Sequence, residues 1–310
     1  MKFLLLLVTA LIGLFFSYYL YFTNSYIKNL NSNSKVVETS LGPIEYTLEG
    51  ESGPVLLFIH GTPGGYDQTT YPTNTIRVLT PSRPGYLRTP LSIGKTPLQQ
   101  AESYKALIDK LGINKVVIMG VSGGGPSSME FAARFPEKTM GLIAFEAVSY
   151  SQDFTKEDAD IIQASDLGLW VQLSLMSFLG NERLAASMLP NPNNRERLLS
   201  SPQNIKELKA LVWSIWPLSL RKEGFDNDYK QFTNLTLSLE EIKVPTLVLH
   251  GDEDINVGLN HAKETTRRIK GAKLHIIKEG DHMMSFTHSK EIDDLIKEFV
   301  TNMSKDWRTQ

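Results

Sequence analysis

The sequence predicts an α/β fold in which helices cover a mostly parallel β-sheet. From residue 36 onward, apolar runs of strand length alternate with segments of helical period, which is typical of a layered α/β protein. Between residues 150 and 235 the alternation stops, and helical patterns follow one another without a convincing strand. We therefore expect a core formed by residues 36–150 and 236–310, a helical cap formed by residues 151–235, and a separate N-terminal segment over residues 1–35.

The N-terminal segment is apolar enough to enter a membrane. Residues 3–22 carry no charge and end in bulky aromatic residues, whereas a cleaved signal peptide ends in small ones. About 20 apolar residues can span a bilayer, which exceeds the roughly 7–15 of a signal-peptide core. We expect residues 3–22 to form an uncleaved anchor that holds the rest of the chain outside the cytoplasm, and residues 24–35 to form a polar tether. Secretion after signal cleavage is the alternative.

The composition excludes several classes of protein. The 310 residues include 32 Lys or Arg and 34 Asp or Glu, so the net charge of −2 lacks the strongly basic balance that is typical of nucleic-acid binding. The absence of cysteine rules out disulfides, a cysteine nucleophile and thiolate metal sites.

The core is expected to open with a β-hairpin and to continue with six buried strands. Two alternating runs joined by a Gly-Pro turn predict the hairpin over residues 36–53. A helix follows the second buried strand: Thr96 and Pro97 form its N-cap and first turn, and Gly112 ends it. The six buried strands are expected within residues 55–61, 75–85, 115–122, 141–149, 244–251 and 272–280.

The expected cap is rich in tryptophan. It contains three of the four tryptophans of the chain, namely Trp170, Trp213 and Trp216. We interpret them as the core of the cap itself, because large aromatic side chains are usually well buried.

A serine followed by three glycines stands between a buried strand and the next expected helix. Gly120-Val121-Ser122-Gly123-Gly124 matches the G-x-S-x-G nucleophile elbow, in which the serine occupies a strained turn. The residues two before and two after the serine must then be small, and both are glycine. A phosphate-binding loop is less well supported, because the stretch lacks the lysine of a P-loop and the third glycine of a dinucleotide turn. Ser122 is therefore the candidate nucleophile, supported by Gly120 and Gly124.

A serine nucleophile needs a base, and the base needs a carboxylate that orients it. On a sheet of this kind the acid and then the histidine follow the serine, each after a late strand. Asp252, Glu253 and Asp254 follow one late strand, and His282 follows the next. We expect His282 to be the base. The other five histidines lie within strands or on expected helices, where structural roles (His60, His250, His275) or ordinary solvent-exposed roles (His261, His288) are expected.

Two backbone N–H groups are expected to stabilise the negative oxygen of the tetrahedral intermediate. One belongs to Gly123, the residue after the serine, and the other belongs to the loop "HGTPGG" that follows the strand within residues 55–61. In that loop Thr62 is the expected donor, with His60 and Gly61 as supporting residues.

With these motifs assembled, the chain resembles the α/β-hydrolase superfamily over about residues 36–303. The segments "HGTPGG", "SRPGY", "GVSGGG", "PTLVLHGDED" and "EGDH" stand in the order and at the spacing of that family. The resemblance implies an eight-stranded, mostly parallel sheet with a helical cap after the sixth strand. It also implies that the acid is Asp254, in the G-x-x-D pattern, with Asp252 as the second choice. "GFDNDYKQF", residues 224–232, is similar to the cap ends of bacterial relatives, but the sequence assigns it no chemical role.

The motifs and the resemblance together predict a serine hydrolase that cleaves carboxylic esters, like a carboxylesterase or a lipase. Ser122 would form an acyl-enzyme, and the apolar helices of the cap favour a hydrophobic small-molecule substrate. No metal or organic cofactor is required, and no protein partner is predicted.

Three alternatives stay open: an aminopeptidase that releases N-terminal proline, a carbon–carbon bond hydrolase of the same fold, and a non-catalytic binding protein on a hydrolase scaffold. The aminopeptidase would need acidic cap residues to hold the substrate amine. We interpret the candidates for that role as a solvated face; they are Glu157, Asp158, Asp160 and Glu182.

Overall fold

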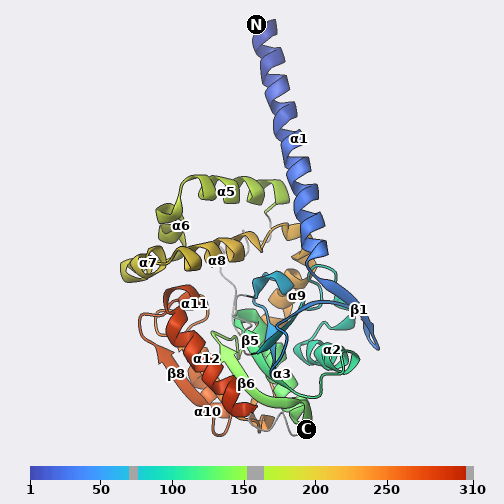
Figure 1. Cartoon of the computed structure of the whole chain (residues 1–310), viewed down its shortest axis with the longest axis vertical. Helices are drawn as coiled ribbons and strands as arrows, with labels where there is room; N and C mark the ends of the chain where they lie inside the picture. The colour runs from blue at the N-terminus through green and yellow to red at the C-terminus, as the bar shows by residue number, and fades with distance from the viewer. Residues whose placement is uncertain (70–75, 152–163, 305–310) are drawn as a thin grey trace. The chain divides into compact units, whose positions relative to one another are not determined.

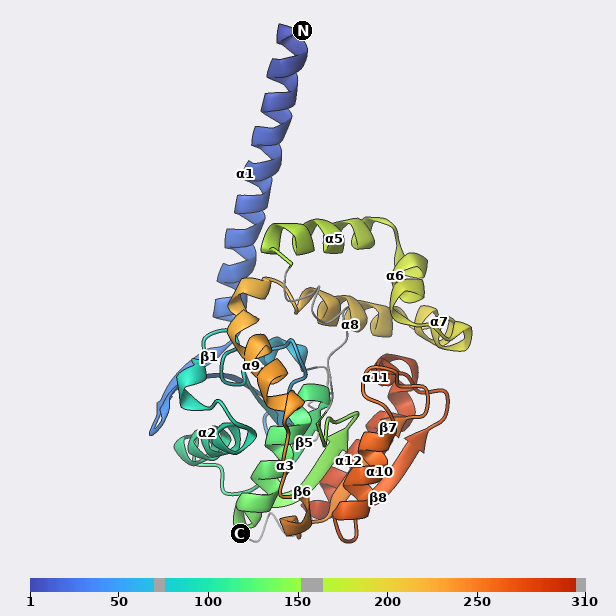
Figure 2. The same ribbon diagram turned by 180° about the vertical axis from the view of Figure 1, so that it is seen from behind.

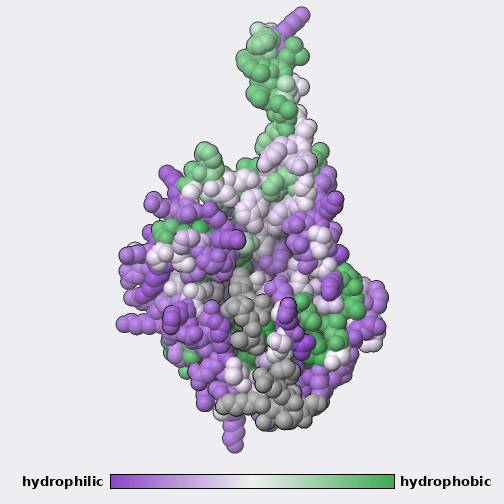
Figure 3. Space-filling model, in the orientation of Figure 1, coloured by the Kyte–Doolittle hydropathy of each residue, from purple (hydrophilic) through white to green (hydrophobic). Residues whose placement is uncertain are grey.

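The computed structural model describes residues 1–69, 76–151 and 164–304, and it divides into two units, Met1–Lys35 and Val36–Gln310 (Figure 1). The first unit is dominated by helix α1 (Lys2–Ser32). This helix includes most of the segment that was expected to be a polar tether, because the helical hydrogen bonds continue past the apolar run to Ser32. Among the described residues, α1 is the one helix long and apolar enough to cross a membrane, and Figure 3 shows apolar side chains covering its N-terminal part. Such a helix is typical of both membrane anchors and signal sequences.

An eight-stranded, mostly parallel sheet forms the centre of the second unit, as predicted. The strand order is β1-β2-β4-β3-β5-β6-β7-β8. Strand β2 pairs antiparallel with β4, and the strands from β4 to β8 pair in parallel. The strands are β1 (Lys35–Thr39), β2 (Gly42–Glu49), β3 (Val55–Ile59), β4 (Arg77–Pro81), β5 (Val116–Val121), β6 (Thr139–Phe145), β7 (Thr246–Gly251) and β8 (Lys273–Ile277).

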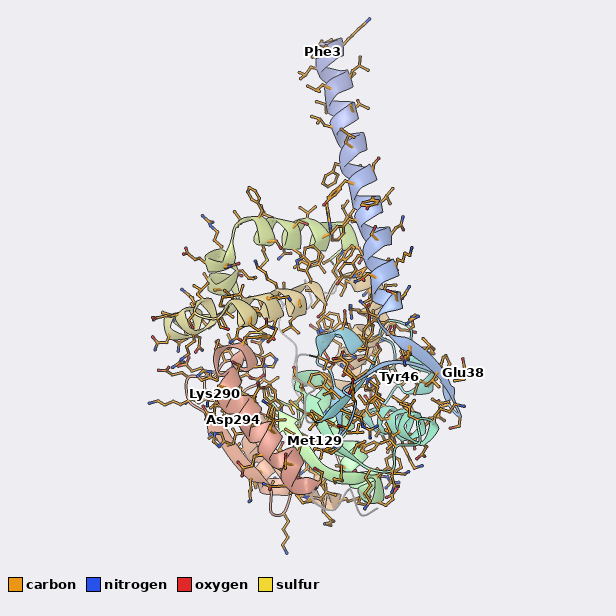
Figure 4. All side chains as sticks on the ribbon, in the orientation of Figure 1. Phe3, Glu38, Tyr46, Met129, Lys290 and Asp294 are labelled. Atoms are coloured by element: carbon orange, nitrogen blue, oxygen red, sulfur yellow. The ribbon has the colours of Figure 1, made fainter. Side chains whose placement is uncertain are left out.

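Helices cover both faces of this sheet, which is why its inner strands are largely apolar. Helices α2 (Pro97–Lys110), α3 (Gly125–Arg134) and α10 (Asn260–Arg268) pack in one hydrophobic cluster. Helix α12 (Ser289–Met303) packs in another, so it is seen in front of the sheet in Figure 1 and behind it in Figure 2. In Figure 4, Met129 of α3 points into the core, whereas Lys290 and Asp294 lie on the exposed side of α12 and form an ion pair of 3.3 Å.

Strand β8 departs from the prediction of six buried strands. It is the last strand of the sheet, so one of its edges has no partner strand among the described residues. Ile277 is buried, but Lys273 and Ile276 are exposed. The apolar run was therefore correctly identified as a strand, and its burial was overestimated because periodicity does not distinguish an edge strand from an inner one.

The start of α2 illustrates how local sequence sets these boundaries. Thr96 accepts a hydrogen bond from the Gln99 N–H at 3.2 Å, and the Gln99 side chain accepts one from the Thr96 N–H at 3.2 Å. This reciprocal capping box satisfies two N–H groups that have no partner within the helix. Gly112 follows the helix with a φ of +67°, a backbone conformation that favours glycine.

The described chain between β6 and β7 contains five α-helices, named here the cap helices. They are α5 (Asp166–Phe178), α6 (Asn181–Met188), α7 (Pro192–Leu199), α8 (Pro202–Trp213) and α9 (Lys222–Thr233). Figures 1 and 2 show α5 to α8 on one side of the sheet, beyond α11 (Met284–Thr287). Trp170 and Trp216 are buried, and the indole N–H of Trp216 donates to the Asp166 carbonyl at 2.9 Å. Trp170 and Trp216 thus lie in the interior, in keeping with the sequence interpretation, whereas Trp213 is half-buried.

Candidate active site

Ser122 lies at the sharp turn between β5 and α3. Its φ is +50°, a strained value for a residue other than glycine. The backbone around it is closely packed: a Cβ on Gly120 would lie 2.0 Å from the Ser128 hydroxyl, and one on Gly124 would lie 2.4 Å from the Ile59 carbonyl oxygen. Only glycine fits at either position. Gly125 is restricted too, because a Cβ there would lie 2.6 Å from that of Ala147.

The structure brings Ser122, His282 and Asp254 together in one hydrogen-bonded chain. His282 Nε2 is 3.2 Å from the Ser122 hydroxyl, and His282 Nδ1 is 2.8 Å from Asp254 Oδ2. The other oxygen of Asp254 accepts the N–H groups of Asn256 and Val257, both at 2.9 Å. Because an ionised carboxylate only accepts, the neutral form of His282 carries its proton on Nδ1 and turns the lone pair of Nε2 towards Ser122.

Asp254 is also the one of the three candidate acids that reaches His282. Asp252 and Glu253 are exposed, and Glu253 accepts a hydrogen bond from Asn191 at 2.8 Å instead. Burial would raise the pKa of Asp254, but the hydrogen bond and positive charge of His282 outweigh it, so its pKa lies below the usual value. The acid therefore stays ionised at neutral pH.

A second buried carboxyl group lies beside the histidine, and the sequence did not reveal it. Glu146 directly follows β6, is only 2% exposed, and has an oxygen 4.0 Å from His282 Nδ1. Its other oxygen has no hydrogen-bond partner among the described residues. Burial raises the pKa of Glu146 well above its usual value, although the positive charge of His282 opposes this shift. The signal available in the sequence was a lone acidic residue at the end of the apolar run "GLIAFEAVS".

The charge state of His282 depends on both carboxyl groups. Burial lowers the pKa of His282, but Glu146 and Asp254 outweigh that effect and raise it to about 9. The donor atoms of Glu146, Asp254 and His282 lie within 4.8 Å of one another, close enough to hold a cation. The hydrogen bond between His282 and Asp254 already satisfies two of these three groups, which fits proton transfer better than metal coordination.

The loop "HGTPGG" lies against Ser122. A Cβ on Gly61 would be 3.3 Å from that of Ser122, and a Cβ on Gly123 would be 2.1 Å from the Thr62 hydroxyl. Thr62 and Gly123 are therefore neighbours beside the serine. His60 fixes the loop from inside the core, since its Nδ1–H donates to the Gly61 carbonyl at 2.8 Å and its Nε2 accepts the Arg83 N–H at 2.9 Å. Burial, followed by the charge of Arg83, holds the pKa of His60 well below its usual value, so it is neutral.

The remaining histidines have structural partners. His250 Nε2 lies 2.7 Å from the Val257 carbonyl, and His275 lies 3.0 Å from Glu291. The prediction of a solvent-exposed role for His261 was wrong: it lies on α10 as expected but is only 3% exposed, because Tyr150 stacks on its ring at 3.8 Å. His288, at the junction of α11 and α12, contacts Thr287 at 2.9 Å.

A cavity of about 620 Å³ opens onto Ser122 and His282 between the core and the cap helices. Most of its walls are apolar. They include Phe58 and Phe145 from the sheet, Leu173 and Met176 from α5, and Leu211 and Val212 from α8. Among the described residues that line it there is no Lys or Arg, and Glu146 is the one acidic residue. A cavity of this size and character suits an uncharged, largely apolar small molecule.

Comparisons with known proteins agree with this architecture. A model of the alpha/beta hydrolase fold matches residues 54–289. YcgS, an uncharacterised hydrolase of Bacillus subtilis, is 28% identical over 258 residues, covering 78% of this chain and 89% of that protein. A 2-hydroxy-6-oxo-6-phenylhexa-2,4-dienoate hydrolase of Burkholderia cepacia is 24% identical over 269 residues, covering 82% and 89%.

Solved structures share the fold over most of the chain. An alpha/beta hydrolase fold protein from Nakamurella multipartita superposes with a TM-score of 0.77 at 30% identity, covering 87% of this chain and 98% of that one. A thermophilic esterase from Thermogutta terrifontis superposes with a TM-score of 0.61 at 21% identity, again covering 87% and 98%.

Proposed function

Because the chain belongs to the α/β-hydrolase fold family, we propose that it is a serine hydrolase that cleaves carboxylic esters through an acyl-enzyme on Ser122. The observation that carries this proposal is the hydrogen-bonded chain from Ser122 through His282 to Asp254, with contacts of 3.2 and 2.8 Å. That chain opens into an apolar cavity large enough for a small ester.

The geometry supports a two-step reaction. In the first step His282 Nε2 takes the proton of the Ser122 hydroxyl as the serine oxygen attacks the ester carbonyl, and it then gives that proton to the departing alcohol. In the second step His282 takes a proton from water as that water attacks the acyl-enzyme, and it then returns the proton to the oxygen of Ser122 as the bond to the acyl group breaks and the acid leaves. Asp254 stabilises the imidazolium in both steps, and the N–H groups of Thr62 and Gly123 hold the oxyanion, each donor being worth roughly 3 kcal/mol.

The cavity favours an uncharged acyl group over the substrate of a carbon–carbon bond hydrolase. Several relatives are named as hydrolases of 2-hydroxy-6-oxo dienoates or dioates, and these compounds carry at least one carboxylate. Such a carboxylate would be buried without a Lys or Arg partner among the described residues lining the cavity, which is costly. Carbon–carbon bond hydrolysis is the second candidate function, and the names of these relatives support it.

Aminopeptidase activity has less support. Glu182 is exposed and does not line the cavity, whereas Glu146 does line it but already lies 4.0 Å from Nδ1 of His282. A carboxyl group that already offsets the charge of the histidine is a poor partner for a substrate ammonium. The other acidic cap candidates, Glu157, Asp158 and Asp160, lie outside the described residues.

A fluorophosphonate probe tests the nucleophile directly. We expect the wild-type protein to be labelled and Ser122→Ala to be unlabelled, whereas equal labelling of both would contradict the assignment. Rates with p-nitrophenyl esters, a 2-hydroxy-6-oxo dienoate and an aminoacyl anilide then separate the three reactions. A protein that reacts with neither the probe nor any of the substrates would be the non-catalytic alternative.

We also propose that α1 is an uncleaved membrane anchor with the hydrolase domain outside the cytoplasm. The helix spans 31 residues, more than the roughly 20 needed to cross a bilayer. Deletion of residues 1–30 should release the protein from the membrane fraction, and the mass of the full-length protein shows whether the segment is retained. Retention of the deleted form on membranes after a high-salt wash would contradict the anchor.

A further inference from the structure

The side chain of Thr62 is held by a residue of the cap helices. Its hydroxyl donates to Asp228 Oδ2 at 2.5 Å and accepts from the guanidinium of Arg83 at 2.9 Å. Asp228 lies on α9, 166 residues further along the chain. Because the hydroxyl uses both its donor and its acceptor capacity, Thr62 cannot rotate without breaking contacts to two buried charged groups.

Asp228 is the centre of a buried polar cluster. Two nitrogens of Arg83 donate to its carboxylate at 2.9 and 2.5 Å, and the hydroxyl of Tyr86 donates at 2.5 Å. Arg83, Tyr86 and Asp228 are each at most 1% exposed. Burial would lower the pKa of Arg83, but Asp228 outweighs it and raises the pKa, so Arg83 stays charged. Burial raises the pKa of Tyr86, which keeps its hydroxyl protonated as a donor.

The same cluster holds the loop at a second point, because Arg83 also donates to the Gly61 carbonyl at 3.2 Å. Backbone contacts fix the cluster on the cap side. The Gly224 N–H donates to the Gly85 carbonyl at 2.8 Å, and a Cβ on Gly85 would lie 2.6 Å from the Gly224 nitrogen. The segments "SRPGY" and "GFDNDYKQF" are thus packed together, and the second one gains a role that the sequence did not assign.

We propose that Asp228 is a positioning residue for the oxyanion hole, through which cap helix α9 sets the place of the Thr62 backbone N–H beside Ser122. This rests on the proposed function, in which that N–H binds the oxyanion. An oxyanion donor acts only within about 2.7–3.1 Å of the developing charge, and a misplacement of about 1 Å can cost on the order of 10²-fold in rate. Loosening the Thr62 side chain therefore lowers kcat, while binding of the ground-state substrate is little changed.

A second ion pair between the same two parts of the chain serves as a matched control. Arg221, which precedes α9, donates to the Gly64 carbonyl at 2.7 Å and to Asp67 at 2.8 Å, in the same loop region. Among the described residues, this pair has no hydrogen bond or ion pair with Thr62 or Ser122. If Asp228 served only to hold α9 against the core, replacing Asp67 and replacing Asp228 would have the same effect on kcat.

The test compares Thr62→Val, which keeps the shape of the side chain but not its hydroxyl, with Thr62→Ser, which keeps the hydroxyl. With a p-nitrophenyl ester we expect Thr62→Val to lose about 10- to 100-fold in kcat with KM within about threefold. Affinity for a trifluoromethyl ketone, which forms a tetrahedral adduct with the serine, should fall by the same factor as kcat/KM. Thr62→Ser should recover most of the loss.

The cap side is tested with Asp228→Asn and Asp67→Asn, each with its melting temperature measured. Both variants should melt earlier, but only Asp228→Asn should lose kcat, and Asp67→Asn should keep it within about twofold. Unchanged kcat in Thr62→Val, or equal losses of kcat in the two Asn variants, would overturn the positioning role while leaving the hydrolase intact. A wild-type protein that neither hydrolyses esters nor reacts with a fluorophosphonate would overturn both proposals.

Discussion

Replacement of Glu146 by glutamine should make the enzyme active at lower pH. In the proposed mechanism His282 must be neutral to take the proton of Ser122, so activity falls as the pH drops through the pKa of His282. Glu146 and Asp254 raise that pKa to about 9. Glutamine keeps the shape of the side chain but carries no charge, so the imidazolium loses one of the groups that stabilise it. The pKa of His282 should therefore fall, and the acidic limb of the pH profile should move down with it.

The distance gives the size of the effect. Two unit charges 4.0 Å apart, the separation of Glu146 and His282, interact by about 1 kcal/mol in bulk water and about 4 kcal/mol at an effective dielectric of about 20. Since one pKa unit corresponds to about 1.36 kcal/mol, the expected shift is about 1 to 3 units. Asp254 and Asp281 also raise the pKa of His282, and both stay in the variant, so part of the elevation is retained.

The assay is kcat/KM for an uncharged p-nitrophenyl ester across the pH range, with enzyme concentration fixed by active-site titration. Glu253→Gln is the matched control, because Glu253 is an exposed acid in the same motif as Asp254 and contacts Asn191 instead. Its profile should coincide with that of the wild-type enzyme. If the acidic limb of Glu146→Gln does not move, Glu146 stays protonated over the whole titration of His282, and the electrostatic argument fails.

Three further predictions follow from the same geometry. Asp254→Asn should lower kcat by on the order of 10⁴-fold without unfolding the protein, since asparagine neither favours the Nδ1–H tautomer nor stabilises the imidazolium; circular dichroism and ester kinetics check this. Leu173→Trp should narrow the cavity and lower kcat/KM for long acyl esters relative to short ones by about tenfold or more, as a chain-length series will show. Gly124→Ala should lower the melting temperature strongly because its Cβ would lie 2.4 Å from the Ile59 oxygen, whereas Gly258→Ala, which meets nothing within 4 Å, should not.

Residues whose role is set by local sequence were predictable. Strands β3, β5 and β7 are buried on both faces, so their apolar runs stand out from the chain on either side. The elbow is predictable for a similar reason, because its turn brings backbone atoms so close that only glycine fits at Gly120 and Gly124. His282 was identified because it follows a late strand. Parallel strands of one sheet end at the same edge, so a loop after a late strand lies close to Ser122.

Residues whose role depends on distant packing were not predictable in this way. Glu146 reads as an ordinary acidic residue, and its burial follows from the meeting of β6 with the loop that carries His282. Asp228 lies among charged and polar residues on a helix, and its partners Arg83 and Tyr86 are 145 and 142 residues away. His261 shows the same limit, since helical periodicity located the helix but did not reveal that Tyr150 covers it.

The buried carboxyl groups of Glu146 and Asp228 act on different parts of the proposed reaction, so their effects should be separable. Glu146 faces His282 and affects the pH range in which that base is neutral. Asp228 contacts Thr62, Arg83 and Tyr86 and affects how strongly the oxyanion is bound. Glu146→Gln should move the pH profile with little change in its plateau, and Asp228→Asn should lower the plateau without moving the profile. Because the two groups have no partner in common in the described chain, the double variant should show both effects in full. A plateau loss in the double variant that differs from that of Asp228→Asn would mean that the base and the oxyanion loop are coupled through the serine turn itself.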